Sequence, residues 1–249
     1  MNDQEKNSGG YESSGFLDIL VRSIWRRIDV QLWLYSSGGY LNESMDLAMM
    51  ERFRSDHPRL CFIPSSFDET DAYFEEFVER FGRFGFDDFY CFHLDQKFTQ
   101  AQLKKAMTSD LIYLSGGNTY YFLASCRRSG IYPYLEQFLS MGGILAGNSA
   151  GAILMTPNIA TAGYPEDDRD EDIIGTDDLT SFGFVDFEFY PHYDHSDYYR
   201  RVLKAASMET AHVLYGVPDG SGICLNGPAL CFFGEVFGFF NGECFRVSD

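Results

Sequence analysis

Basic residues are scarce in this sequence of 249 residues. It has 19 lysines and arginines against 37 aspartates and glutamates, which gives a formal net charge of −18 at pH 7. A chain with this excess of negative charge repels nucleic-acid phosphates and anionic lipid headgroups. The composition therefore argues against nucleic acids and membrane surfaces as partners.

Three other patterns are missing. No apolar run approaches the roughly 20 residues of a membrane span, and the N-terminus lacks the basic and then apolar segments of a secretory signal. The six cysteines include no C-x-x-C pair, so nothing favours a zinc or thioredoxin-like site. Most of them lie among apolar residues, as buried, reduced thiols do. We therefore expect a cytoplasmic protein that needs no metal or organic cofactor.

The hydrophobic content of 45% and the chain length suffice for a large packed core. Residues 1–15 are polar and rich in glycine and serine, and residues 16–29 allow one short amphipathic helix. We predict a partly ordered N-terminal extension over residues 1–30 and a single α/β domain over residues 31–249.

Short apolar runs alternate with segments of helical spacing in the first 150 residues. The predicted strands are Gln31–Tyr35, Leu60–Pro64, Phe89–His93, Leu111–Leu114 and Gly143–Ala146. The predicted helices are Asn42–Phe53, Glu69–Phe84, Thr99–Met107, Asn118–Ser129 and Tyr132–Met141. This alternation predicts an α/β fold with a mostly parallel sheet flanked by helices. Five short strands are expected to close the same domain, namely Val213–Val217, Gly222–Leu225, Ala229–Phe233, Val236–Phe240 and Cys244–Val247.

The most informative motif is G-x-S-x-G over residues 147–151, which comes directly after a predicted strand. A serine on a tight turn between strand and helix is the arrangement of a nucleophile elbow, which requires small neighbouring residues. Ser149 is therefore the candidate nucleophile. The N–H of Ala150, at the start of the following helix, would point toward an oxyanion that forms there.

A second glycine-rich turn, Ser115-Gly116-Gly117-Asn118, follows the preceding predicted strand. In a parallel sheet this turn opens at the same edge as Ser149. We expect the N–H of Gly117 to be the second donor of an oxyanion hole, whereas Asn118 also fits a plain helix N-cap.

A serine nucleophile needs a base, and the chain has only five histidines. His192 ends an apolar run downstream of the elbow and is the leading candidate. His195 is the second candidate, although its position suits a surface loop. Asp219, in a Pro-Asp-Gly sequence at another strand end, is the candidate for the acid that orients the imidazole. A structural Pro-Asp-Gly turn remains the alternative for Asp219.

Four segments carry a family resemblance, and they occur in the order Gly116–Thr119, Gly147–Ala152, Pro191–Tyr193 and Gly216–Gly220. Together they resemble the dipeptidase E family, the aspartyl dipeptidases of the S51 serine peptidases, a group that also contains cyanophycinases. The resemblance covers about residues 31 to 247.

The resemblance implies a flavodoxin-like three-layer sandwich similar to the class I glutamine amidotransferases. It also implies a Ser-His-Glu/Asp triad in that chain order. On the matching positions Ser149 would be the nucleophile, His192 the base and Asp219 the orienting acid, with Gly117 and Ala150 forming the oxyanion hole. The implied activity is the hydrolysis of dipeptides with an N-terminal aspartate through an acyl-enzyme.

This chain departs from the family pattern at several positions. Dipeptidase E carries glutamate where Asp219 stands, and a bulkier aromatic residue where Asn148 stands. Arg200 and Arg201 are the local candidates for holding an acidic substrate side chain, and charges on a helix surface are the alternative interpretation. Asn118 is a further candidate for substrate binding.

Residues 166–172 form an acidic run in which six of seven side chains are carboxylates. The run lies between the elbow and His192, so it would be a lid if it hangs over the site. A lid of this charge would disfavour an anionic Asp-Xaa substrate and favour one that carries arginine or lysine. A solvated surface loop is the alternative.

Two other functions remain open from the sequence. One is a cyanophycinase-like exopeptidase that acts on β-Asp-Arg units, and the other is a catalytically inactive homologue that binds a ligand. A general esterase fits less well, because its chain order places the acid before the histidine. The expected partner is a small peptide substrate, and the protein would be a monomer or a homodimer.

Overall fold

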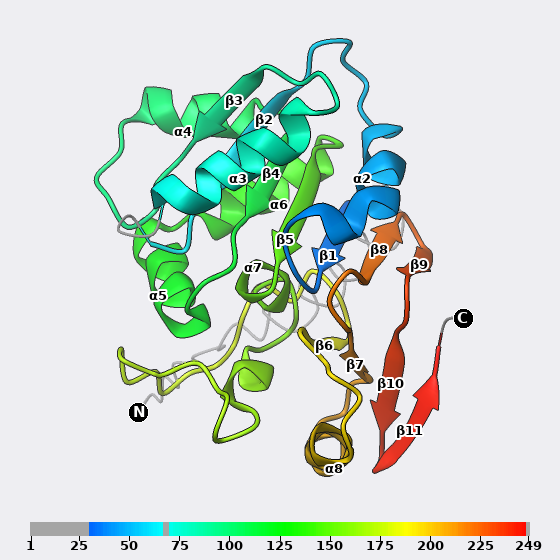
Figure 1. The fold of residues 1–249 in the computed structure, drawn as a ribbon. Helices are drawn as coiled ribbons and strands as arrows, with labels where there is room; N and C mark the ends of the chain where they lie inside the picture. The colour runs from blue at the N-terminus through cyan, green and yellow to red at the C-terminus, as the bar shows by residue number, and fades with distance from the viewer. Residues whose placement is uncertain (1–29, 67–69, 248–249) are drawn as a thin grey trace, which may run out of the picture.

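The computed structural model describes residues 30–66 and 70–247, so the predicted extension over residues 1–30 lies outside this part except for its last residue. The main sheet has seven strands in the order β3-β2-β4-β5-β1-β8-β9 (Figure 1). Its strands are β1 (Gln31–Tyr35), β2 (Arg59–Ile63), β3 (Asp88–Cys91), β4 (Leu111–Leu114), β5 (Ile144–Asn148), β8 (Gly222–Asn226) and β9 (Ala229–Phe233). The first five pair in parallel, and β8 and β9 join in antiparallel. The predicted, mostly parallel α/β sheet is confirmed.

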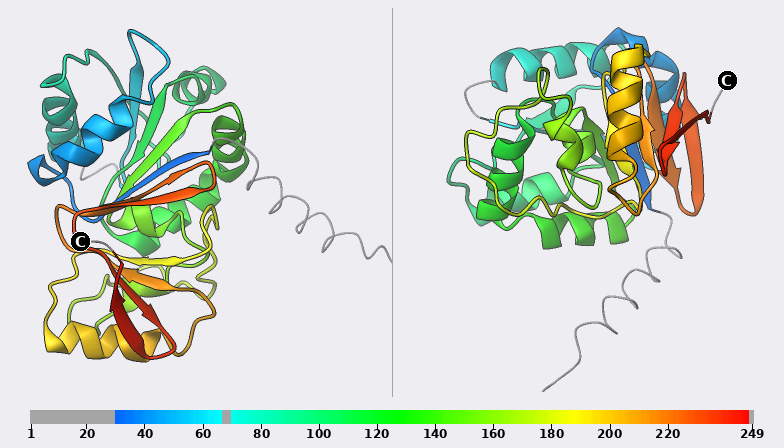
Figure 2. Two further views of the ribbon diagram at one scale, coloured as in Figure 1. Left: turned by 90° about the vertical axis from the view of Figure 1, so that its right-hand side faces the viewer. Right: turned by 90° about the horizontal axis from the view of Figure 1, so that it is seen from below.

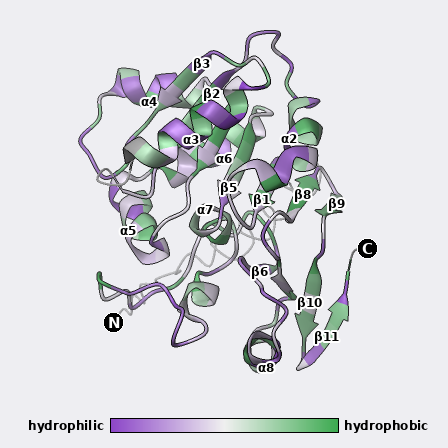
Figure 3. Cartoon of the chain, viewed as in Figure 1, coloured by the Kyte–Doolittle hydropathy of each residue, from purple (hydrophilic) through white to green (hydrophobic). Residues whose placement is uncertain are grey.

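Helices cover both faces of this sheet. They are α2 (Glu43–Met50), α3 (Thr70–Gly82), α4 (Gln100–Met107), α5 (Thr119–Ser129) and α6 (Tyr132–Ser140). Side chains of β1 alternate between the two helix-covered faces of the sheet. Trp33 and Tyr35 pack in one apolar cluster with residues of α2 and α3. Leu32 and Leu34 belong to the other cluster, which includes residues of α4, α5 and α6. Figure 3 shows apolar residues along the strands, with polar positions interspersed along the covering helices.

The helix boundaries follow local signals in the sequence. Thr99 caps α4 with a complete capping box, since its side chain accepts from the N–H of Gln102 while the Gln102 side chain accepts from the N–H of Thr99. The Asn118 side chain accepts from the N–H of Tyr121 and caps α5. The largest boundary error is in α2, which ends at Met50, three residues before the predicted end.

A second sheet, which the sequence did not predict, lies below the first (Figures 1 and 2). Its order is β11-β10-β7-β6, with β6 (Glu188–Tyr190), β7 (Leu214–Gly216), β10 (Phe237–Phe240) and β11 (Glu243–Arg246). The closing strands were therefore predicted as strands, but they divide between two sheets. Helix α8 (Asp197–Ala206) packs beside this sheet, and the short α7 (Ala150–Ile153) and the 3-10 turns η1 (Tyr40–Asn42) and η2 (Ala160–Gly163) complete the elements.

The cysteines are free throughout the described residues, as expected of reduced thiols. Cys61, Cys126 and Cys224 are buried, and burial raises the pKa of each thiol. Cys231 corrects the expectation of burial. It is exposed because β9 is the edge strand of the main sheet.

A buried ion pair joins α3 to α2 on the face of the main sheet that these two helices cover. The Arg80 guanidinium donates to both carboxylate oxygens of Asp46 at 2.8 and 2.5 Å, and both side chains are at most 4% exposed. Arg80 also donates to the Tyr113 hydroxyl at 3.2 Å. Since neither charge can reach water, each depends on the other for compensation.

We predict that Asp46→Ala lowers the free energy of unfolding by about 3–5 kcal/mol, because it leaves the Arg80 charge buried and uncompensated. The exposed pair of Arg127 with Asp178, at 3.1 Å, supplies the control. Asp178→Ala should cost less than about 1 kcal/mol. Urea unfolding of the two variants and the wild type measures both values, and equal losses would contradict the prediction.

Candidate active site

Ser149 lies on a sharp turn between β5 and α7, where the G-x-S-x-G motif predicts it. Its backbone has φ 49° and ψ −108°, a strained conformation for a residue with a side chain. The carbonyl of Tyr35, at the end of β1, accepts from the Ser149 N–H at 3.0 Å. The strained turn is therefore fixed to the neighbouring strand at the carboxyl edge of the sheet.

The two glycines of the motif are there because the backbone is crowded. A Cβ on Gly147 would lie 2.4 Å from the backbone of Gly151, and one on Gly151 would lie 2.3 Å from the carbonyl oxygen of Leu114. Either contact is far inside van der Waals distance, so no side chain fits. The two glycines therefore meet the steric requirement of a nucleophile elbow, and the motif is not a chance match.

The structure brings the three side chains singled out from the sequence into one hydrogen-bonded line. His192 Nε2 lies 2.9 Å from Ser149 Oγ, and His192 Nδ1 lies 2.7 Å from Asp219 Oδ1. The His192 and Asp219 side chains are about half exposed, so solvent and small molecules reach the line. The shorter aspartate side chain spans the distance that the resemblance assigns to glutamate.

Three hydrogen bonds from Ser36 and Ser37, which the sequence analysis missed, support this line. Ser36 follows β1, and its hydroxyl accepts from the His192 N–H at 2.8 Å and donates to the carbonyl of Val217 at 2.8 Å. The adjacent Ser37 hydroxyl accepts from the N–H of Gly220 at 3.2 Å. The serine pair after β1 was visible in the sequence, but nothing local indicated that it meets segments about 155 and 180 residues away.

Free backbone donors lie next to Ser149. Among the described residues no acceptor binds the N–H of Gly117 or the N–H of Ala150. The turn that contains Gly117 is held to the elbow, because the Ser115 carbonyl accepts from the N–H of Gly151 at 3.0 Å. Gly117 has φ 123°, which favours glycine at this position. Two unsatisfied N–H groups beside a serine hydroxyl can stabilise a negatively charged oxygen.

The three candidate substrate-binding residues are less clearly placed. Asn118 caps α5, and its amide donates to the carbonyl of Glu171 at 2.8 Å. Arg200 lies 3.8 Å from Asp197 within α8, and Arg201 is exposed on the same helix. In the described part of the chain no hydrogen bond or ion pair joins either arginine to Ser149 or His192, so a role in substrate binding stays a prediction.

Three of the other four histidines contact residues other than Ser149 and Asp219, and the fourth is exposed in a loop. His195, the second candidate for the base, lies 3.4 Å from Glu235. His212 contacts the carbonyl of Asp186 at 2.9 Å, and His93 lies 3.6 Å from the Cys91 sulfur. His57 is exposed in the loop before β2.

The acidic run over residues 166–172, here called the acidic strap, lies in the loop between η2 and β6 and is hydrogen-bonded to both α5 and α8. At one end the Asp170 carboxylate accepts from the N–H of Thr119 at 2.7 Å, next to Asn118. At the other end the hydroxyls of Tyr198 and Tyr199 donate to Asp167 and Asp168. The bond to Asp168 raises the pKa of the Tyr199 hydroxyl. The acidic strap is thus bound to both helices. Its partner in α5, Thr119, is two residues from Gly117.

Residues 30–66 and 70–247 contain no helix whose length and hydropathy suit a membrane crossing. They also contain no group of three or more histidine, cysteine, aspartate or glutamate residues that could hold a metal ion.

Solved structures with the same fold include two peptidases. One is a protein of Listeria monocytogenes EGD-e described as a candidate peptidase E, with a TM-score of 0.66 and 22% identity over 82% of this chain and 97% of that one. The other is a peptidase from an acI-B1 actinobacterium, with a TM-score of 0.65 and 14% identity over 89% and 95%. Both agree with the α/β fold.

Relatives that are similar in sequence are also named as peptidases. An uncharacterized peptidase of Bacillus subtilis is 27% identical over 66% of this chain and 69% of its own length. An uncharacterized peptidase of Pasteurella multocida is 34% identical, although the match spans only 42% of that relative. Peptidase E of Shewanella amazonensis is 25% identical over 53% of this chain and 57% of its own.

A family model gives the most extensive match. The model for peptidase family S51 matches residues 32–230, which include Ser149, His192 and Asp219. With the fold and these relatives, this match confirms the resemblance that the sequence motifs indicated: the chain belongs to peptidase family S51.

Proposed function

We propose that this protein is a serine peptidase that hydrolyses short peptides through an acyl-enzyme on Ser149. The observation that carries the proposal is the unbroken line from the Ser149 hydroxyl through His192 to Asp219, with distances of 2.9 and 2.7 Å. Hydroxyl, imidazole and carboxylate in this sequence of contacts are the parts of a serine nucleophile, its general base and the group that orients the base.

In the proposed reaction His192 Nε2 takes the Ser149 proton as Oγ attacks the carbonyl carbon of the scissile peptide bond. Asp219 holds the proton on Nδ1 and stabilises the imidazolium that forms. The imidazolium then gives its proton to the leaving amine, and the C–N bond breaks. Water repeats the attack with His192 as base, which releases the acid and restores the hydroxyl.

The negative oxygen of each tetrahedral intermediate would be held by the N–H groups of Gly117 and Ala150. Both donors lack a partner among the described residues, so no existing hydrogen bond must break when charge develops. Fixed donors of this kind lower the barrier because they are already oriented before the reaction.

The substrates we propose are dipeptides with an N-terminal aspartate, as the family resemblance implies. A second candidate is an exopeptidase on β-Asp-Arg units. The acidic strap favours this second candidate, because the carboxylates of Asp167 and Asp168 are bound to α8 and that of Asp170 is bound to the first residue of α5, two residues after Gly117. Negative charge there opposes an aspartyl carboxylate and attracts a guanidinium.

One prediction of the proposed function concerns the nucleophile. We expect a dipeptide library that includes Asp-Xaa and β-Asp-Arg to contain at least one substrate of the wild type. Ser149→Ala should lower the rate on that substrate by at least about a thousandfold. Ser140→Ala, on the exposed end of α6, is the control and should keep full activity.

A rate that survives Ser149→Ala would contradict the mechanism. A folded wild type that cleaves nothing and leaves Ser149 unmodified by a fluorophosphonate would instead favour the inactive, ligand-binding homologue.

The second prediction concerns Ser36 as a positioning residue. Ser36→Ala removes the acceptor of the His192 N–H, so kcat should fall roughly ten- to a hundredfold and the free energy of unfolding by about 1–3 kcal/mol. Ser207 is the matched control, because it is also fully buried. Its hydroxyl donates to the carbonyl of Lys204 in α8 and accepts from the N–H of Gly242 in the turn between β10 and β11. Ser207→Ala should lose similar stability at unchanged kcat, and equal kcat in the two variants would refute the role of Ser36.

A further inference from the structure

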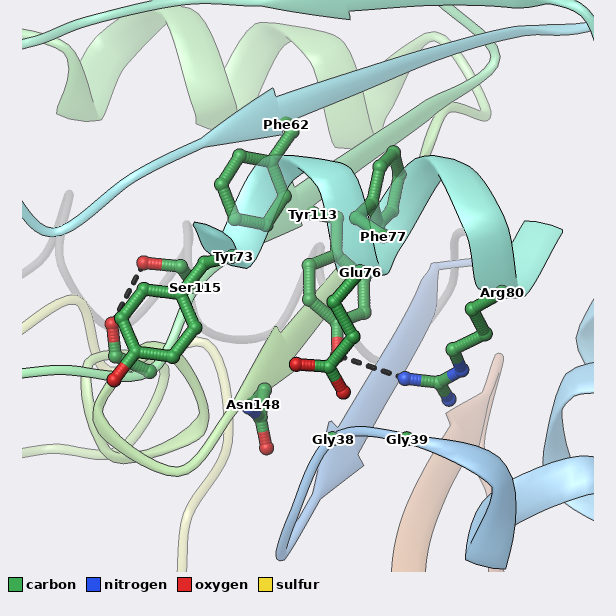
Figure 4. A pocket seen from close by; sticks show the side chains of 11 residues that line it. Gly38, Gly39, Phe62, Tyr73, Glu76, Phe77, Arg80, Tyr113, Ser115 and Asn148 are labelled. Atoms are coloured by element: carbon green, nitrogen blue, oxygen red, sulfur yellow. Dashed lines mark hydrogen bonds between the residues drawn. The ribbon is translucent and has the colours of Figure 1, made fainter. Parts of the chain in front are cut away.

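A pocket adjoins Ser149 on the α3 side of the sheet, and the proposed mechanism does not use it (Figure 4). The pocket is open to solvent. The residues that matter here are Gly38, Tyr73, Glu76, Tyr113, Gly116 and Asn148. They come from the turn after β1, from α3, and from the ends of β4 and β5. We call this space the Glu76 pocket.

Two glycines show that the Glu76 pocket is continuous with the nucleophile. A Cβ on Gly38 would lie 3.3 Å from Glu76 Oε1 and 3.4 Å from Asn148 Nδ2. A Cβ on Gly116 would lie 3.3 Å from Asn148 Nδ2 and 3.7 Å from the Cβ of Ser149. Gly38 therefore lies close to both Glu76 and Asn148, and Gly116 lies close to both Asn148 and Ser149.

The charge of the Glu76 pocket is negative. No hydrogen bond or ion pair from the described residues reaches the Glu76 carboxylate. Figure 4 shows this carboxylate between the side chains of Asn148 and Arg80. The Arg80 charge is already matched by Asp46, at 2.8 and 2.5 Å, so Glu76 is the uncompensated charge.

The remaining surface suits a cation with an aliphatic stem. Phe62, Phe77 and Tyr113 form an aromatic base, and Tyr73 forms a partly exposed wall. Aromatic faces attract ammonium and guanidinium groups and pack against methylenes.

We propose that the Glu76 pocket binds an organic cation of the peptide substrate, an ammonium or guanidinium group, with Glu76 as the residue that determines this specificity. The inference rests on the proposed peptidase function. The cation is either the free α-ammonium group of the substrate or a lysine or arginine side chain. An aspartyl carboxylate is excluded from this pocket, because Glu76 repels it and Arg80 has no free charge to offer.

The first test measures binding without catalysis. Full-length wild type, Glu76→Gln and Glu75→Gln are titrated with n-butylammonium and n-butylguanidinium, and with butan-1-ol as the neutral analogue. Glu75 is the matched control, because it is exposed on the same helix, does not line the pocket and carries the same charge. We expect Glu76→Gln to weaken cation binding about tenfold or more, and Glu75→Gln to leave it unchanged.

The second test identifies the source of the cation in a peptide. The Ser149→Ala protein is titrated with matched dipeptides that differ in one group: a free or acetylated N-terminus, and lysine or norleucine. A loss of affinity of roughly tenfold on acetylation, seen only while Glu76 is present, assigns the pocket to the α-ammonium group. A similar loss from lysine to norleucine assigns it to a basic side chain.

Either of two results in the first test would overturn the proposal: cation binding that is equal in Glu76→Gln and Glu75→Gln, or butan-1-ol that binds as well as the cations. Insensitivity of affinity to both peptide changes would do the same. Failure of the peptidase function is detected separately, by fluorophosphonate labelling of Ser149. Cation binding that depends on Glu76 can be measured whether or not that label forms.

Discussion

The hydroxyl of Ser36 joins the two sheets of this protein at the place where the proposed catalytic side chains meet. Ser36 directly follows β1, and its hydroxyl accepts from the N–H of His192 and donates to the carbonyl of Val217, two residues before Asp219. Ser149 is fixed to the same strand through the carbonyl of Tyr35. One strand end therefore sets the positions of the proposed nucleophile, base and acid, although 43 residues separate Ser149 from His192 and 27 separate His192 from Asp219.

Steric and electrostatic constraints around this point act together. Gly147 and Gly151 let β5 turn tightly enough to present Ser149 and to leave the N–H of Ala150 free. Carboxylates lie on both sides, since the acidic strap is bound at the N-terminus of α5 and Glu76 lies in the pocket toward α3. The net charge of −18 is thus not spread evenly over a solvated surface. Under the proposed function, part of it lies where a peptide would bind and would favour cationic groups on the substrate.

Local patterns carried much of the fold. The strands over residues 31–35, 111–114 and 229–233 have their predicted limits, and Thr99 and Asn118 cap helices as their side chains indicate. The elbow was predictable because its glycine spacing is a local steric requirement. The second sheet was not, because the division of the closing strands depends on pairing with distant segments. The role of Ser36 and the pairing of Arg80 with Asp46 could not be predicted for the same reason, because the residues that bond to each other are 34 to 181 positions apart.

The most direct measurement is a crystal structure of the protein after reaction with diisopropyl fluorophosphate. The account predicts one adduct, with phosphorus bonded to Ser149 Oγ and the phosphoryl oxygen about 3 Å from the N–H groups of Gly117 and Ala150. An adduct on another residue would contradict it, as would a phosphoryl oxygen turned away from both donors or a folded protein that forms no adduct.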